Sequence, residues 1–426
     1  MKKKLRTLLV WILVSLSLQF GGYSLLNNQI QKIMGPPAGD DESSITSQLQ
    51  ATIPGSNLTN VQVSYAKDYL AYSENGTFKI FNLKKGKVVF EKKSPSDTER
   101  TLGVFTYQWL PDRNNIVYFY AKKNPNEVTT VKVDPPKPKT AASAIEPKTE
   151  DPNQAKNIPQ EVPVEPKLEK RYGSPQITEL YSLELPNSDE DIALDDQLHS
   201  FKTPSDSEEI SAGGKIEKFV VSTATNLMYL TVTKGATQQL MKIGIMKEVS
   251  ALNKPSERID NMAISERYGT LYIDSKVRDI QQVVAIQYVA ALDNDKRLVI
   301  SKNPNDRILG IRNGKVYIGE VETSKLVKIK TTDDLQVVKD SPSLKTEWEG
   351  SIPINENVRM LIGVAGQLII YDNLTAYIVA DGHFADLKFH GDENYISVDG
   401  AEQIQLTRAG TSTLVELQLL KLQAIK

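Results

Sequence analysis

The chain has 426 residues, with 51 basic and 53 acidic side chains, three histidines and no cysteine. The absence of cysteine excludes disulfides, thiolate catalysis, thiolate–metal sites and lipoprotein processing. A net charge of −2 gives no reason to expect nucleic acid as a partner.

The N-terminal end predicts where the protein works. Four basic side chains within the first six residues precede an uncharged run over 7–26, and ~20 such residues suffice for a helix to cross a bilayer. Positive charge before the run favours a cytoplasmic N-terminus. We therefore expect residues 1–6 to be a cytoplasmic tail and 7–26 a transmembrane signal anchor in the cell membrane. The protein would be single-pass, with an extracytoplasmic body.

A cleaved secretory signal and a buried helix are the alternatives for this segment. The densest apolar part, Leu8 to Leu18, is short enough for a signal peptide. However, the first alanine is Ala38, and the best pair of small residues for cleavage is Gly22 and Ser24. The uncleaved anchor is therefore the preferred interpretation.

Three polar stretches divide the rest of the chain. Residues 27–56 are expected to form a spacer, because Gly35-Pro36-Pro37 breaks any helix. The tract 134–172 is rich in Pro, Lys and Glu and predicts a disordered insertion, since it cannot bury enough apolar area to offset ordering entropy. An acidic loop is expected over 186–214. The folded body is thus assigned to 57–426.

Short strands and tight turns fill this body. The first unit, from Val61 to Phe90, contains four strands, and its Asn75-Gly76 is typical of a two-residue hairpin turn. Comparable units begin near Tyr107, Ile216, Arg258, Leu298, Met360 and Leu387. About seven units at a spacing of ~40 residues predict an all-β propeller of about seven four-stranded blades. Six or eight blades, an irregular β-sandwich and two small β domains are the alternatives.

Two of these units carry a recognisable pattern. Ser64 to Tyr72 is followed by Ile80 to Val88, and Trp109-Leu110-Pro111-Asp112 precedes Ile116-Val117-Tyr118. These residues resemble the blades of TolB-like and WD40-like bacterial β-propellers, in which Trp-Ser-Pro-Asp-Gly precedes an apolar strand. The resemblance implies a binding or scaffolding role and supplies no catalytic residues.

Motifs for chemistry are missing from the sequence. Gly-x-Ser-x-Gly, Walker A, Gly-x-Gly-x-x-Gly, His-Glu-x-x-His and the EF-hand loop do not occur. His383 and His390 lie near several carboxylates over 381–393, which admits a metal or acid–base site, but turn chemistry explains these residues better. His199 is expected to be solvated in the acidic loop. We assign no catalytic, cofactor-binding or metal-binding residue, and no cofactor.

Two further groups of residues have a structural and a functional interpretation. The acidic turns Asp293-Asn294-Asp295 and Asn303 to Asp306 fit no calcium-loop template and are expected to be turns. Tyrosine and tryptophan side chains are expected to pack between blades rather than form a ligand platform: Tyr65, Tyr69, Tyr72, Trp109, Tyr118 and Tyr120. Trp348 fits either interpretation.

Three functions are compatible with the sequence. The first is a membrane-anchored, extracytoplasmic propeller that binds or scaffolds an envelope protein or a cell-wall component. The second is an envelope hydrolase or lyase with paired carboxylates at the channel mouth. The third is a sensory domain that reports to a separate membrane protein. We prefer the first and expect the protein not to be an enzyme.

Overall fold

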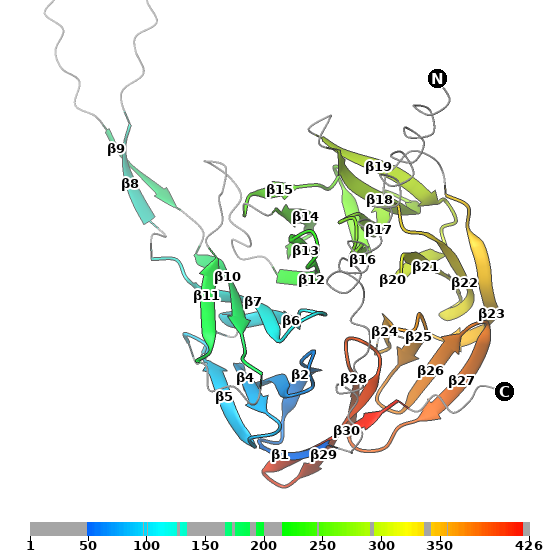
Figure 1. The fold of residues 1–426 in the computed structure, drawn as a ribbon. Helices are drawn as coiled ribbons and strands as arrows, with labels where there is room; N and C mark the ends of the chain where they lie inside the picture. Colours follow the sequence, from blue (N-terminus) through cyan, green and yellow to red (C-terminus); the bar gives the residue numbers. More distant parts are fainter. Residues whose placement is uncertain are drawn as a thin grey trace, which may run out of the picture.

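The computed structural model describes residues 49–420, apart from 97, 100, 126–127, 134–166, 173–174, 188–192, 200–214, 245–246, 290–293, 336–341 and 356. In this part of the chain, seven four-stranded antiparallel sheets are arranged around an axis as the blades of a β-propeller (Figure 1). The first strand of each blade lies next to the axis. The described residues contain no helix long and apolar enough to span a bilayer, and the proposed anchor over 7–26 lies outside them.

Blades 1 to 3 follow one another along the chain. Their strands are β2 (Leu58–Val63), β3 (Tyr69–Glu74), β4 (Thr77–Asn82) and β5 (Lys87–Lys92); β6 (Gly103–Trp109), β7 (Asn115–Lys123), β10 (Gln176–Glu184) and β11 (Asp195–His199); and β12 (Lys215–Ser222), β13 (Leu227–Lys234), β14 (Thr237–Ile243) and β15 (Val249–Ala251).

Blades 4 to 6 repeat the same order. Their strands are β16 (Glu257–Ile264), β17 (Leu271–Val277), β18 (Ile280–Val289) and β19 (Asn294–Ser301); β20 (Asp306–Arg312), β21 (Lys315–Glu322), β22 (Lys325–Asp333) and β23 (Lys345–Pro353); and β24 (Arg359–Ile362), β25 (Leu368–Tyr371), β26 (Thr375–Ala380) and β27 (His383–Lys388).

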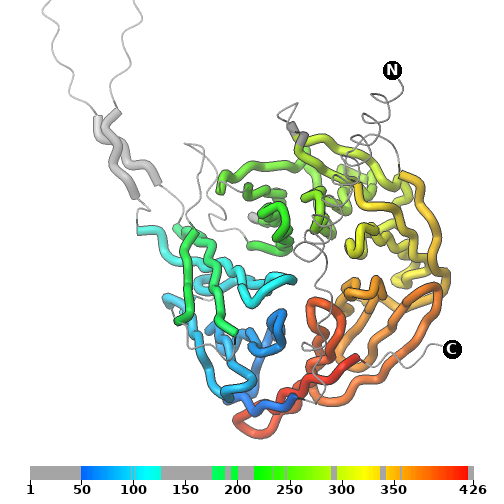
Figure 2. The backbone as a smooth tube through the Cα atoms, viewed as in Figure 1, coloured from blue at the N-terminus to red at the C-terminus, as the bar shows by residue number. Residues whose placement is uncertain are grey.

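Blade 7 combines both ends of the described chain. Its strands β28 (Glu393–Ile396), β29 (Glu402–Ala409) and β30 (Ser412–Leu419) are completed by β1 (Leu49–Pro54), which pairs antiparallel with β30 as the outermost strand. Figure 2 shows the blue N-terminal strand lying against the red C-terminal strands. Residues 49–54 therefore belong to the propeller and not to the expected spacer. Sequence missed them because a single strand without a hairpin partner nearby has no repeat signal.

The core is divided among the interfaces between neighbouring blades. Each adjacent pair of blades encloses one cluster of buried apolar side chains, and the pair formed by blades 7 and 1 is included. In β3, for example, Tyr69 and Ala71 pack toward blade 2, whereas Leu70 and Tyr72 pack toward blade 7. Since successive side chains point to opposite faces of a strand, a blade buried on both faces needs apolar residues at consecutive positions.

The turns predicted from Asn-Gly pairs are confirmed. Asn75 and Gly76 have φ of 49° and 78°, and Asn313 and Gly314 have φ of 52° and 72°. Type I′ turns require positive φ at both central residues, which Asn and Gly adopt at low cost. These turns join β3 to β4 and β20 to β21, so they fix the register of two blades.

The boundaries between the later repeats were predicted wrongly. Residues 298–301 belong to β19 and close blade 4, and residues 387–388 belong to β27 and close blade 6. The sequence had placed both segments at the start of the next unit. Neighbouring strands of an antiparallel meander have similar patterns, so the repeat gave the number of units but not which strand lies next to the axis.

The insertion in blade 2 contains regular structure at its base. β8 (Val128–Val133) and β9 (Lys167–Tyr172) pair antiparallel as a separate two-stranded sheet between β7 and β10, which projects away from the ring (Figure 1). Residues 167–172 had been assigned to the disordered insertion. Strand β11 likewise lies inside the expected acidic loop 186–214 and forms the outer strand of blade 2.

Candidate functional site

The predicted packing role of the aromatic residues is confirmed for four of them. Tyr69, Tyr72, Trp109 and Tyr118 are almost completely buried between blades 1 and 2 or blades 7 and 1. Tyr120 is half-buried. Tyr65 is different, because it lies in the turn between β2 and β3 and is 38% exposed. The sequence pattern does not distinguish Tyr65 from the buried Tyr69 and Tyr72, since all three lie in the same repeat unit.

The three histidines do not converge. His383 begins β27, and His390 lies in the loop between β27 and β28; both are exposed. His199 ends β11 and its Nε2 lies 2.6 Å from Ser182 Oγ, so the expectation of a solvated loop residue was wrong. Burial and the charge of Lys247 lower the pKa of His199.

The expected acidic turns are partly strands: Asp295 lies in β19 and Asp306 begins β20, and ion pairs tie both into the structure. Asp295 Oδ1 lies 3.3 Å from Lys242 Nζ of blade 3, whereas Asp293 is outside the described residues. Asp306 is fully buried, and its two carboxylate oxygens lie 2.9 and 3.3 Å from Lys330 Nζ. Trp348 lies in β23, and its ring is stacked on that of Phe384 in β27 at 6.3 Å between centroids.

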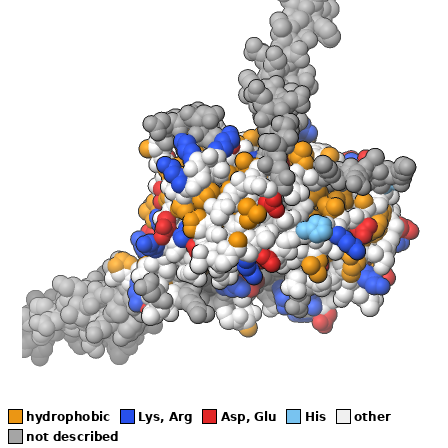
Figure 3. Space-filling model, turned by 90° about the horizontal axis from the view of Figure 1, so that it is seen from below, with side chains coloured by type: hydrophobic (Ala, Val, Ile, Leu, Met, Phe, Trp, Pro, Cys, Tyr) orange, Lys and Arg blue, Asp and Glu red, His pale blue; other side chains and the backbone are white. Residues whose placement is uncertain are grey.

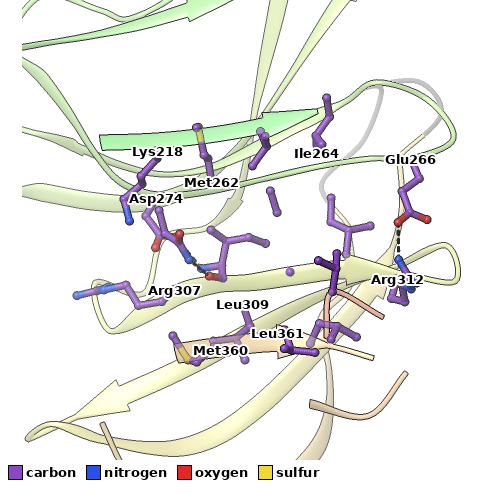
Figure 4. Close-up of a pocket in the computed structure, with 18 of the residues that line it drawn as sticks. Lys218, Met262, Ile264, Glu266, Asp274, Arg307, Leu309, Arg312, Met360 and Leu361 are labelled. Carbon is purple, nitrogen blue, oxygen red and sulfur yellow. Dashed lines mark hydrogen bonds and ion pairs between the residues drawn. The ribbon is translucent and has the colours of Figure 1, made fainter. Parts of the chain in front are cut away.

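A central cavity of about 610 Å³ extends along the first strands of blades 3 to 6, with contributions from blades 2 and 7. Apolar side chains line its middle, namely Met262, Ile264, Leu309, Met360 and Leu361 (Figure 4). Volumes of 300–1,000 Å³ are usual for small-molecule sites. The sequence did not predict this cavity, because its lining comes from six repeats that meet only around the axis.

Bulges shape the lining strands. The pairing shifts between Ile259 and Met262 in β16, and between Ile308 and Gly310 in β20. A bulge leaves backbone groups without a ladder partner and redirects the local side chains. The neighbouring blade satisfies them here: Asn261 Nδ2 donates to the Ile308 carbonyl at 2.7 Å, and the Ile308 N–H donates to Asp274 Oδ1 at 2.6 Å.

Among the carboxyl groups that line the cavity, Asp274 has the pKa that differs most from its ordinary value. Only 1% of its surface is exposed, and burial raises its pKa to about 8. Its Oδ2 atom is buried without a hydrogen-bond partner in the described residues. At neutral pH the group is therefore mainly protonated. A carboxylate within the apolar strand Leu271 to Ser275 was the sequence signal that could have revealed it.

The two ends of the cavity differ in charge. Lys218, Asp274 and Arg307 lie at one end, and Glu266 and Arg312 lie at the other (Figure 4). Glu266 Oε1 and Arg312 Nη1 are 2.6 Å apart, so these charges neutralise each other.

A second candidate surface is formed by the turns between the first and second strands of the blades, here called the first-turn face. Tyr65, Val364 and Val398 lie in these turns in blades 1, 6 and 7 and are 38%, 48% and 37% exposed. Since these blades are neighbours around the ring, the three apolar side chains lie on one side of the propeller.

Hydrogen bonds link the turns of the first-turn face to one another. Val364 N donates to the Asp399 carbonyl at 2.8 Å, Asn313 Nδ2 donates to the Val364 carbonyl at 2.8 Å, and Ala66 N donates to Asn114 Oδ1 at 3.0 Å. These bonds link the turns of blades 5, 6 and 7 to one another and, separately, the turns of blades 1 and 2. The exposed apolar residues therefore lie on a rigid support.

A buried charge network connects blade 7 to blade 1. Lys67 Nζ lies 2.6 Å from Asp399 Oδ2 and 2.9 Å from Glu402 Oε2, and Ser397 Oγ lies within hydrogen-bond distance of both carboxylates. Burial raises the pKa of Asp399, but Lys67 and the hydrogen bonds outweigh this and lower it overall. Burial raises the pKa of Glu402, although Lys67 opposes the shift.

Comparisons with known proteins show no family for this chain. No family model and no curated protein matches the sequence. Hsv2 of Kluyveromyces lactis is a similar solved structure, with 11% identity and a TM-score of 0.42, covering 86% of this chain and 98% of its own. The AfRom2 CNH domain is 9% identical, with a TM-score of 0.41, over 88% of this chain and 99% of its own. A prolyl endopeptidase is 13% identical, with a TM-score of 0.43, over 82% of this chain and 45% of its own.

Proposed function

We propose that this protein is a membrane-anchored, extracytoplasmic β-propeller that binds another protein of the cell envelope through its first-turn face. The observation that carries the proposal is the exposed trio Tyr65, Val364 and Val398 on hydrogen-bonded turns of adjacent blades. Exposed apolar side chains on a pre-organised surface are typical of protein interfaces. The edge of the disc near blade 7 instead carries mixed basic, acidic and hydrophobic side chains (Figure 3).

The anchor and the location belong to the same proposal. The basic residues before the uncharged run 7–26 support a cytoplasmic N-terminus and an extracytoplasmic body. The absence of cysteine allows a direct test, since any introduced cysteine is unique. We expect a cysteine in place of the exposed Lys302 to react with a membrane-impermeant maleimide in intact cells. Labelling only after permeabilisation would place the body in the cytoplasm and contradict the proposal.

Site-resolved photo-crosslinking in intact cells tests the binding face. We expect p-benzoylphenylalanine at position 65 to form an adduct with one envelope protein. Ile280 is the matched control, since it is apolar, 63% exposed and located at the start of β18, directly after the turn between the second and third strands of blade 4. Equal adducts at both positions would contradict the proposed face. An adduct that disappears on glycan digestion would instead assign a cell-wall component as the partner.

The enzyme interpretation has one observation in its favour. Asp260 and Asp274 both line the cavity, and Asp274 is protonated at neutral pH as a general acid would be. However, Asp274 is 1% exposed and its Oδ1 is already bonded to a backbone N–H. This geometry suits a structural carboxyl group that supports a bulge, so binding remains the proposed function.

A further inference from the structure

The central cavity has the length and the lining of a site for an elongated molecule. Its wall includes Arg307 at the start of β20 and Arg312 at its end, and five strand steps span about 16 Å. Between these ends the wall is formed mainly by aliphatic and methionine side chains. An apolar chain placed there would be removed from water, with a gain of roughly 25 cal/mol for each Å² of apolar surface buried.

The two ends of the cavity differ in charge, so an elongated ligand with one charged end would bind in one orientation. Arg312 is neutralised by Glu266 at one end. At the other end, Asp260 is paired with Arg258 at 3.0 Å, while Lys218 and Arg307 form no ion pair with a described carboxylate. Arg307 Nη1 donates to the backbone carbonyls of Pro304 and Asp306, so the rest of its guanidinium remains available. This end is therefore the electropositive one.

Asp274 provides an independent indication of a ligand at the same end. Its side chain lines the cavity beside Lys218 (Figure 4). Its Oδ2 is buried and has no hydrogen-bond partner among the described residues. Buried polar atoms usually have a hydrogen-bond partner, so this oxygen is a candidate partner for a polar group bound beside it. A protonated carboxyl group can donate a hydrogen bond to an anionic oxygen.

We propose that the cavity binds a single-chain amphiphile with an anionic headgroup, with the chain between blades 3 to 6 and the headgroup beside Lys218 and Arg307. Carboxylate and phosphate oxygens share the chemistry that these two cations and a donor would recognise. A free fatty acid and a lipid phosphate are thus two sources of the same ligand chemistry, which the test separates.

Calorimetric titration of the full chain in nanodiscs tests this site, with decanoate, decyl phosphate and decyltrimethylammonium as probes. We expect the two anions to bind and the cation not to bind. Tighter binding of decanoate would assign a carboxylate ligand, and tighter binding of decyl phosphate a phosphate ligand. Lys218→Gln is expected to raise the Kd of the preferred anion about tenfold, as loss of a partly buried ion pair would.

Two variants separate this effect from general electrostatics and from folding. Lys215→Gln removes the same charge from an exposed position at the start of β12 and should leave the Kd unchanged. Leu361→Trp fills the cavity and should abolish binding of all probes without lowering the thermal midpoint by more than a few degrees. Equal Kd values for the Lys218 and Lys215 variants, or binding of the cationic probe as tight as that of decanoate, would overturn the proposal.

Discussion

Replacement of Lys67 by methionine is expected to lower the free energy of unfolding by about 3–5 kcal/mol, because it leaves one buried and one partly buried carboxyl group without their cation. Lys67 joins Asp399 and Glu402 across the interface between blades 1 and 7. Its backbone has φ of 62°, which costs ~1–2 kcal/mol for a residue with a side chain. Methionine keeps that backbone cost and the apolar stem, so the comparison isolates the charge.

Denaturant unfolding of the full chain measures this effect. Lys93→Met is the control in the same blade, since Lys93 directly follows β5 and pairs with Glu91 at 3.7 Å, with both side chains exposed (77% and 39%). Its loss should cost less than about 1 kcal/mol, as for other surface pairs. Hydrogen exchange should also accelerate first in the β1–β30 ladder of the Lys67 variant. Similar stabilities of the two variants would show that the network does not hold the ring closed.

Replacement of Asp274 by asparagine is expected to stabilise the protein at pH 8 by up to ~5 kcal/mol, while changing little at pH 4. Burial raises the pKa of Asp274 to about 8 in the folded protein, from an ordinary value of 3.8. Asparagine keeps an oxygen for the Ile308 N–H and has no charge to bury. The charged groups near Asp274 are Asp260, Lys218 and Arg307.

Proton binding in the two states determines whether this pKa shift raises or lowers the free energy of unfolding. Below pH 3.8 the carboxyl group is protonated in both states and contributes nothing. Between about pH 4 and pH 8 the unfolded chain loses this proton and the folded chain keeps it, so stability falls by ~1.4 kcal/mol per pH unit. Above pH 8 both states are ionised and the penalty stays constant. The variant lacks this decline.

Unfolding free energies measured from pH 4.5 to pH 9 test the prediction. The curves for the natural protein and for Asp274→Asn should converge at low pH and separate as pH rises. Asp279→Asn serves as the control, because it makes the same substitution in the exposed turn between β17 and β18 of the same blade, and it should leave the decline in stability between pH 4 and pH 8 in place. Parallel curves for Asp274→Asn as well would mean that Asp274 is ionised in the folded state.

Local signals in the sequence were sufficient for the fold class. Asn75-Gly76 and Asn313-Gly314 encode their turns through backbone conformation alone, and the short apolar strands between turns encode the blades. The closing strand β1 could not be recognised, since its partner residues are distant in sequence and only Ile53 in it is buried.

The candidate sites required the three-dimensional arrangement. Tyr65 and Tyr69 belong to the same motif, yet one is exposed in a turn and the other is buried between blades. Lys218, Asp274 and Arg307 come from three blades and lie at one cavity end only because the ring closes. An isolated charge within an apolar strand, such as Asp274, is the sequence feature from which a buried polar group of this site could have been predicted.

Because β1 precedes all the blades in the sequence and pairs with β30, the propeller ring can close only after β30 has been synthesised. Gln50 and Glu416, which bond across the β1–β30 pair, are 366 residues apart in the sequence. During synthesis β1 emerges before any blade, and its partner strand emerges last. Until then the outer position of blade 7 is empty and one face of blade 1 lacks its neighbour. A chain that ends before β30 cannot form a closed ring, so a truncated product keeps an apolar surface that proteases and chaperones can recognise.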